Sequence, residues 1–107
     1  MMSDYAIVLT TFTSSEQAKP IIDEVIKSKL AACAQEINIK SHYVWNEEYC
    51  HDNEVLVLFK TRKTLYGELE KKLKELHPYE TPEIIMLDIS DGYLGYLTWI
   101  NKQTKEL

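Results

Sequence analysis

The sequence predicts an α+β protein of the ferredoxin-like kind, with the order βαββαβ and one further helix at the C-terminal end. Short apolar runs without helical spacing occur at residues 5–11, 54–61 and 84–89, and two amphipathic helical patterns separate them. Residues 37–45 alternate between apolar and polar side chains, which is the period of a strand with one wetter face. This order is the split βαβ sandwich, with two helices on one face of a four-stranded antiparallel sheet. The 107 residues fit a single domain spanning residues 1–107.

The first strand, residues 5–11, precedes a helix that starts with a capping signal. Thr13-Ser14-Ser15-Glu16 matches a capping box, in which the Thr13 hydroxyl and the Glu16 carboxylate bind free backbone amides. Apolar residues then recur at helical spacing as far as Leu30. Because Pro20 lies inside this pattern, we expect it to bend the helix or to delay its start.

The second and third strands, residues 37–45 and 54–61, are expected to pair as a hairpin. Residues 46–53 between them are polar and acidic, so we expect a long loop there. The apolar spacing after the hairpin predicts one more strand between two helices. These elements are expected at residues 65–76 (helix), 84–89 (strand) and 93–100 (helix).

Composition and charge limit the function classes. The net charge of −5 provides no basic surface for nucleic acid. The first residues lack the basic region and apolar run of a secretory signal, and no segment is long enough to span a membrane. Cys33 and Cys50 lie far apart in no Cys-x-x-Cys motif, which suits free thiols in a reducing compartment. We therefore expect a cytoplasmic protein with no nucleic-acid or membrane partner.

One face of the predicted sheet has no helix to cover it. The strands at residues 5–11, 54–61 and 84–89 are nevertheless apolar on both faces, and the strand at residues 37–45 adds Tyr43 and Trp45. Because such a surface is unfavourable in water, we expect other copies of the chain to cover it in an obligate oligomer. The residue pattern alone does not set the number of copies, and a two-fold dimer is the commonest arrangement.

The most constrained stretch is Leu76-His77-Pro78-Tyr79-Glu80-Thr81-Pro82-Glu83. Its two prolines fix their own φ angles and favour extended geometry in the residues before them. The imidazole, phenol and carboxylates of this stretch are therefore held in place, as a docking surface or a ligand site requires.

Five blocks of the sequence together form a family pattern. The blocks are Leu30-Ala31-Ala32-Cys33-Ala34, Tyr43-Val44-Trp45, Leu58-Phe59-Lys60-Thr61, His77-Pro78-Tyr79-Glu80-Thr81-Pro82-Glu83 and Tyr96-Leu97-Thr98-Trp99-Ile100. In this order they resemble the CutA divalent-cation tolerance proteins. The resemblance implies a ferredoxin-like homotrimer in which hairpins of neighbouring subunits pair at their edges. It also implies copper binding through a first-strand cysteine and two consecutive histidines, where this chain has Thr10, Leu76 and His77.

Three places are candidate metal sites. His77 is a candidate ligand, and the alternative is that it caps the preceding helix. Cys33 is a second candidate, and the alternative is a small packing residue. Cys50-His51 is a candidate pair of soft metal ligands. The alternative is that the two side chains point apart, because adjacent residues in a strand or turn diverge. The metal would be copper or another divalent cation, and we expect none to be needed for folding.

The family resemblance also places a second set of five residues near subunit contacts, where a small pocket is expected. It could hold a small anion or metabolite, and its alternative role is interface packing. No nucleophile with an adjacent base and no glycine-rich phosphate loop occurs, so we expect no catalysis. Two functions follow: a non-enzymatic trimer that binds copper or similar cations weakly, or a signalling or scaffold trimer that binds a small anion or a partner protein. The pocket residues are Tyr43, Trp45, Lys60, Tyr79 and Glu83.

Overall fold

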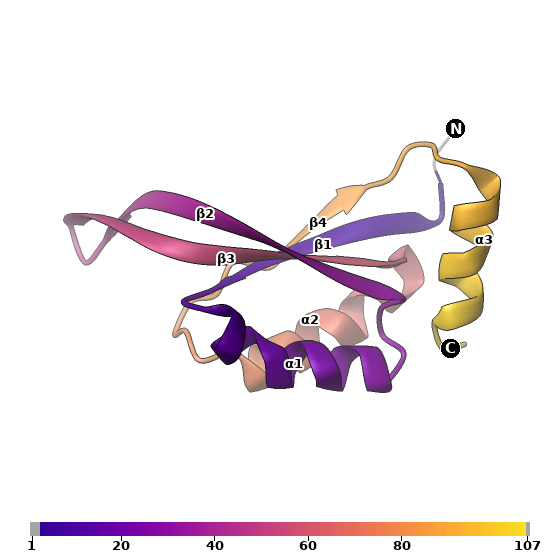
Figure 1. The fold of residues 1–107 in the computed structure, drawn as a ribbon, viewed down its shortest axis with the longest axis horizontal. Helices are drawn as coiled ribbons and strands as arrows, with labels where there is room; N and C mark the ends of the chain where they lie inside the picture. The colour runs from indigo at the N-terminus through magenta and orange to yellow at the C-terminus, as the bar shows by residue number, and fades with distance from the viewer. Residues whose placement is uncertain (1–2, 107) are drawn as a thin grey trace.

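The computed structural model describes residues 3–106 and confirms the predicted fold class (Figure 1). Met1 and Met2, which entered the signal-peptide argument, lie outside the described residues. One antiparallel sheet has the strand order β2-β3-β1-β4. The elements are β1 (Tyr5–Phe12), α1 (Ser15–Lys27), β2 (Cys33–Trp45), β3 (Glu48–Arg62), the 3₁₀ turn η1 (Lys63–Leu65), α2 (Tyr66–Leu76), β4 (Ile85–Asp88) and α3 (Leu94–Gln103).

The core lies between the sheet and the two helices α1 and α2, which cover one face together (Figure 1). The buried side chains of β1 and β3 alternate with half-buried ones along most of their paired length, as expected for a sheet covered by helices on one side. Val57 and Phe59 of β3 are fully buried against this layer, as are Leu69 and Leu73 of α2. The apolar stripes predicted for both helices therefore face this core.

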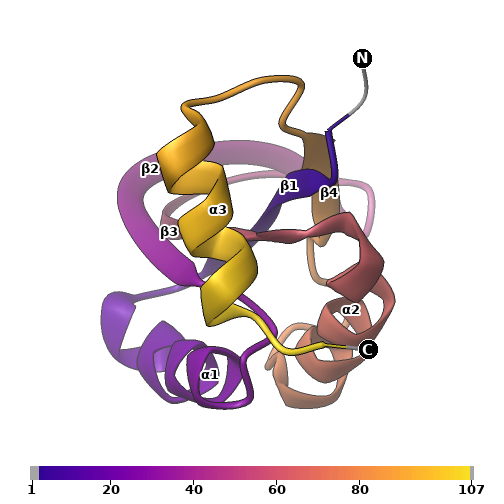
Figure 2. The same cartoon turned by 90° about the vertical axis from the view of Figure 1, so that its right-hand side faces the viewer.

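The third helix, α3, lies across one end of the sheet, near the start of β1 (Figure 2). Leu97 and Ile100 are its buried residues. The chain after it is tied to the end of β3, because Arg62 Nε donates to Thr104 Oγ1 over 2.9 Å. This helix leaves the middle of the sheet's second face uncovered. No helix within residues 3–106 combines the length and apolarity needed to cross a membrane.

The start of α1 differs by one residue from the predicted capping box. Ser14, and not Thr13, is the N-cap, and its hydroxyl accepts from the Gln17 amide over 3.1 Å. Gln17 Oε1 in turn accepts from the Thr13 amide over 2.8 Å. Pro20 lies inside the helix and does not delay its start, which corrects that expectation. At this sixth helical position the proline removes one intrahelical hydrogen bond, the one to the Glu16 carbonyl, and the helix continues past it to Lys27.

The hairpin corrects the predicted long loop at residues 46–53. The strands β2 and β3 pair without interruption from Cys33–Lys60 to Trp45–Glu48, so Asn46 and Glu47 alone form the turn. Both have positive φ angles, 50° and 66°, as a type I′ turn requires. Since β1 pairs with β3 only as far as Val55, the rest of the hairpin projects as a two-stranded arm (Figure 1).

The sheet face away from α1 and α2 is apolar and largely uncovered, as the sequence pattern predicts. Ile37, Ile85 and Leu87 on this face are 49%, 46% and 46% exposed. Free strand edges within residues 3–106 are the outer edge of β4, the outer edge of β2 and, along the arm, the other edge of β3. We call the apolar sheet face away from α1 and α2 the open face. Its apolar residues are Ile7, Leu9, Ile37, Leu56, Leu58, Ile85 and Leu87.

Candidate functional site

His77 is buried just after α2, and both of its ring nitrogens have partners. The Tyr79 amide donates to His77 Nδ1 over 3.1 Å, so the proton lies on Nε2, which donates to the Thr11 carbonyl over 2.8 Å. The ring stacks on Phe12 with centroids 4.5 Å apart and planes 10° apart. Burial lowers the pKa of His77, although the Thr11 bond and the charge of Glu54 act in the opposite direction. The ring is thus a neutral structural link between β1 and the loop after α2.

The three positions implied for copper do not offer a fitting set of donors. Thr10 is fully buried, and its hydroxyl, a poor copper ligand, has no hydrogen-bond partner within residues 3–106. Leu76 has no donor atom, and His77 has no free nitrogen lone pair. Metal ligation by His77 stays a prediction, and it requires its bond to Tyr79 or Thr11 to break. No group of three or more His, Cys, Asp or Glu in the described chain is placed to hold a metal ion.

Cys33 is the first residue of β2 and lies at the other end of the sheet from His77. It is a half-buried free thiol whose partner on β3 is Lys60, whereas Thr11, which His77 contacts, pairs with Leu56. Four strand positions separate these two partners, which corresponds to about 13 Å. The structure therefore does not bring the two predicted metal ligands together.

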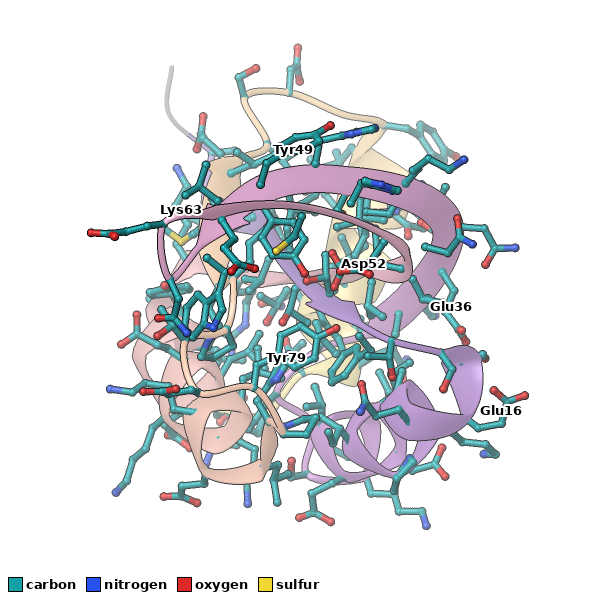
Figure 3. All side chains as sticks on the ribbon, turned by 90° about the vertical axis from the view of Figure 1, so that its left-hand side faces the viewer. Glu16, Glu36, Tyr49, Asp52, Lys63 and Tyr79 are labelled. Atoms are coloured by element: carbon teal, nitrogen blue, oxygen red, sulfur yellow. The ribbon has the colours of Figure 1, made fainter. Side chains whose placement is uncertain are left out.

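Two of the predicted pocket residues, Tyr43 and Tyr79, form hydrogen bonds to acidic residues of β3, and Tyr79 and Asp52 are labelled in Figure 3. The Tyr43 hydroxyl donates to the Asp52 carboxylate, and this bond, aided by burial and nearby negative charge, raises the pKa of Tyr43 to about 12. The Tyr79 hydroxyl donates to Glu54 Oε2 over 2.7 Å. Burial is the main cause that raises the pKa of Tyr79, and this hydrogen bond raises it further. Trp45 lies at the arm's tip and is 42% exposed.

The other predicted pocket residues are placed elsewhere. Lys60 Nζ donates to Gln35 Oε1 over 2.6 Å and lies 5.6 Å from the centroid of the Tyr96 ring. Lys60 and Glu54 are six positions apart on β3, or about 20 Å. Glu83 is exposed on the loop before β4. One chain therefore does not assemble the predicted pocket, which would need residues from neighbouring copies.

The sequence reasoning missed Asp52 and Glu54, the acidic partners of the two tyrosines. Strand alternation carries the missing signal, because Asp52 lies two residues beyond Cys50, the cross-strand partner of Tyr43. Finding it requires the hairpin register, which depends on the position of the turn.

Strand alternation also separates the side chains of the predicted metal pair Cys50-His51, as expected for adjacent residues that diverge. Both residues belong to β3, so their side chains point to opposite sides of the ribbon. Cys50 shares its side with Tyr43 and Asp52. His51 instead faces His42, its direct partner on β2, which the sequence reasoning did not single out.

Comparisons with known proteins agree with this fold. The model of the family described as "CutA1 divalent ion tolerance protein" matches residues 6–103. The divalent-cation tolerance protein CutA of Pyrococcus horikoshii is 39% identical over 100 residues, or 94% of this chain and 98% of that protein. The protein of the same description from Thermus thermophilus is 37% identical over 99 residues, or 92% and 96% of the two chains.

Solved structures give the same result at the level of the backbone. The crystal structure of CutA1 from Oryza sativa has a TM-score of 0.93 to this chain at 34% identity, and covers 99% of this chain and 98% of that one. The resemblance based on the five sequence blocks is therefore confirmed. The chain belongs to the CutA1 divalent ion tolerance protein family.

Proposed function

We propose that the chain acts as a homotrimer in divalent-cation tolerance, and that it binds copper or similar cations weakly without catalysing a reaction. The observation that carries the assembly is the open face, where Ile37, Ile85 and Leu87 are each close to half exposed. Monomeric proteins rarely expose contiguous apolar patches of this kind. The family and the relatives described above supply the link to ion tolerance.

The free strand edges support a ring of copies. The arm has two free edges, β2 and the part of β3 before Val55, so pairing one edge in one copy with the other edge in the next is a heterologous contact. Such contacts form a closed ring when the rotation between copies closes. Three copies are the number that the family resemblance implies. This ring also protects the edges from uncontrolled strand pairing.

Sedimentation of the chain and of two variants tests the assembly. We expect the unmodified chain to sediment at three times its mass of 12.5 kDa. Leu87→Glu places a charge on the open face and should release monomers. Leu76→Glu is the matched control, because Leu76 is 41% exposed but lies at the end of α2. A stable monomer of the unmodified chain at micromolar concentration would contradict the proposal.

Calorimetric titration with copper under reducing conditions tests cation binding. We expect weak binding by the unmodified chain. His77→Ala tests the predicted ligand separately, because heats unchanged by this substitution would remove His77 from the site. The bonds from His77 to Thr11 and Tyr79 make this unchanged result the one that we expect. Complete absence of heat with the unmodified chain would contradict the cation-binding part of the proposal.

A second function, a signalling or scaffold trimer, is favoured by the surroundings of Lys60. Its ammonium group has no carboxylate partner within residues 3–106 and lies against Gln35 and the Tyr96 ring. A cation held in this way suits a small anion or an acidic group of a partner protein. Thermal melting with a panel of anionic metabolites should show a rise in melting temperature that Lys60→Gln removes. Unshifted curves across the panel would count against this function.

A further inference from the structure

Two of the three histidines face each other across the arm. His42 of β2 and His51 of β3 are direct cross-strand partners, and their ring centroids are 6.1 Å apart with planes 30° apart. Both side chains are exposed. In β3 the buried residues Val57 and Phe59 have odd numbers, so His51 continues their side of the ribbon, away from Asp52 and Tyr43.

The spacing of the two rings is close to that of two imidazoles on one metal ion. Metal–nitrogen distances of about 2.0–2.1 Å place two ligating ring centroids roughly 4.5–6.4 Å apart, depending on the angle at the metal. The observed 6.1 Å lies within this range. Because both rings are exposed, rotation about the side-chain bonds can turn one nitrogen of each toward a shared ion without disturbing the core.

The Tyr49 hydroxyl is within hydrogen-bond distance of one of these rings. The hydroxyl oxygen lies 2.6 Å from His42 Nδ1, and the Tyr49 ring is near both imidazoles, with centroids 6.1 Å from His42 and 6.0 Å from His51. When Nδ1–H donates to this oxygen, the lone pair of His42 lies on Nε2 and is free. Histidines that bind metals usually donate their other N–H to an oxygen in this way. His51 has no hydrogen bond to its ring within residues 3–106, so its nitrogens are also free.

We propose that His42 and His51 form a chelating site for a divalent transition-metal ion, with Tyr49 as a positioning residue. Imidazole nitrogen suits Cu²⁺, Ni²⁺ and Zn²⁺, and the usual affinity order makes Cu²⁺ the tightest of these. The site holds one ion per chain. It lies on the side of the ribbon opposite Tyr43 and Asp52, so pairing of the arm's edges leaves it open. This metal-site proposal depends on the proposed function only where it gives the site a role in ion tolerance.

Titration of the full chain with NiCl₂, followed by calorimetry and NMR, tests the site. Ni²⁺ is paramagnetic and is not reduced by the free thiols of Cys33 and Cys50. We expect one Ni²⁺ per chain and strong broadening of the ring signals of His42 and His51, but not of His77. His42→Gln and His51→Gln should each weaken binding roughly tenfold or more, since one imidazole cannot chelate.

Two further variants separate the site from other binding. His77→Gln should leave Ni²⁺ affinity unchanged. Tyr49→Phe should weaken binding by up to about tenfold while both ring signals still broaden, as expected for a positioning residue. Unchanged affinity in both His42→Gln and His51→Gln would overturn this site and leave the proposed cation binding intact. Failure of the unmodified chain to bind Ni²⁺ or Cu²⁺ at millimolar concentration would overturn both.

Discussion

Replacing the buried imidazole of His77 should destabilise the fold by an amount that depends on pH. His77→Ala removes the stack on Phe12, worth about 1 kcal/mol, and leaves the Thr11 carbonyl and the Tyr79 amide without their partner. Hydrogen bonds contribute about 1 kcal/mol each, and an unpaired buried carbonyl adds to the loss. We expect the free energy of unfolding to fall by about 3 kcal/mol at pH 8.

The pH dependence follows from the direction of the His77 pKa. Burial lowers this pKa in the folded state, so the unfolded chain takes up a proton at a higher pH than the folded chain does. The stability from neutral His77 is therefore fully present above the unfolded value of about 6.5 and is lost as pH falls through the lower folded pKa. Protonation would also place an N–H on Nδ1, against the donating Tyr79 amide. The cost of His77→Ala should shrink from pH 8 to pH 5.

Urea denaturation from pH 8 to pH 5 measures this cost. Protein concentration must be held fixed, because the stability of an assembly depends on it. Val25→Ala is the matched control, since Val25 is fully buried in α1 and carries no titratable group. It should cost about 2 kcal/mol at every pH. A cost of His77→Ala that stays constant across this range, or that changes only as much as the control, would refute the reasoning.

Three further substitutions test the local structure by denaturant unfolding. Ser14→Ala removes the N-cap of α1 and should cost about 1 kcal/mol, whereas Ser15→Ala, one residue inside the helix, should cost less. Glu47→Gly should stabilise the hairpin by about 1 kcal/mol, because glycine adopts the positive φ angle of 66° without strain. Tyr79→Phe removes the bond to Glu54 and should cost about 1–3 kcal/mol, and the double variant with Glu54→Gln should cost less than the sum of the two single variants.

The fold could be predicted from the sequence because its core obeys simple periods. Helical spacing of apolar residues marks the buried faces of α1 and α2, and short apolar runs mark the strands β1 and β3. Both patterns can be read from one sequence. The β3 half of the arm could not be predicted, because residues 48–53 meet solvent and show no apolar alternation. Its turn also lacks glycine, although Asn46 and Glu47 both have positive φ angles.

The candidate site was predicted less completely, because its contacts depend on distant parts of the chain. The His77-Pro78 stretch indicates a fixed imidazole, but the group that accepts its Nε2–H hydrogen bond is the Thr11 carbonyl, 66 residues away in the sequence. Every residue has a backbone carbonyl, so the identity of the side chains does not show which carbonyl will accept the bond. Sequence reasoning could therefore select His77 and could not decide between a ligand and a structural link.

The register of the hairpin decides which chemistry each side of the arm carries. With the observed two-residue turn, one side gathers Tyr43 and Asp52, and the other gathers His42, Tyr49 and His51. A slip of one residue in either strand would move all of its side chains to the opposite side. His42 would then face Cys50 or Asp52 in place of His51, and the imidazole pair would be lost. The turn at Asn46-Glu47 provides none of the proposed ligands, yet it sets the register that places His42 opposite His51.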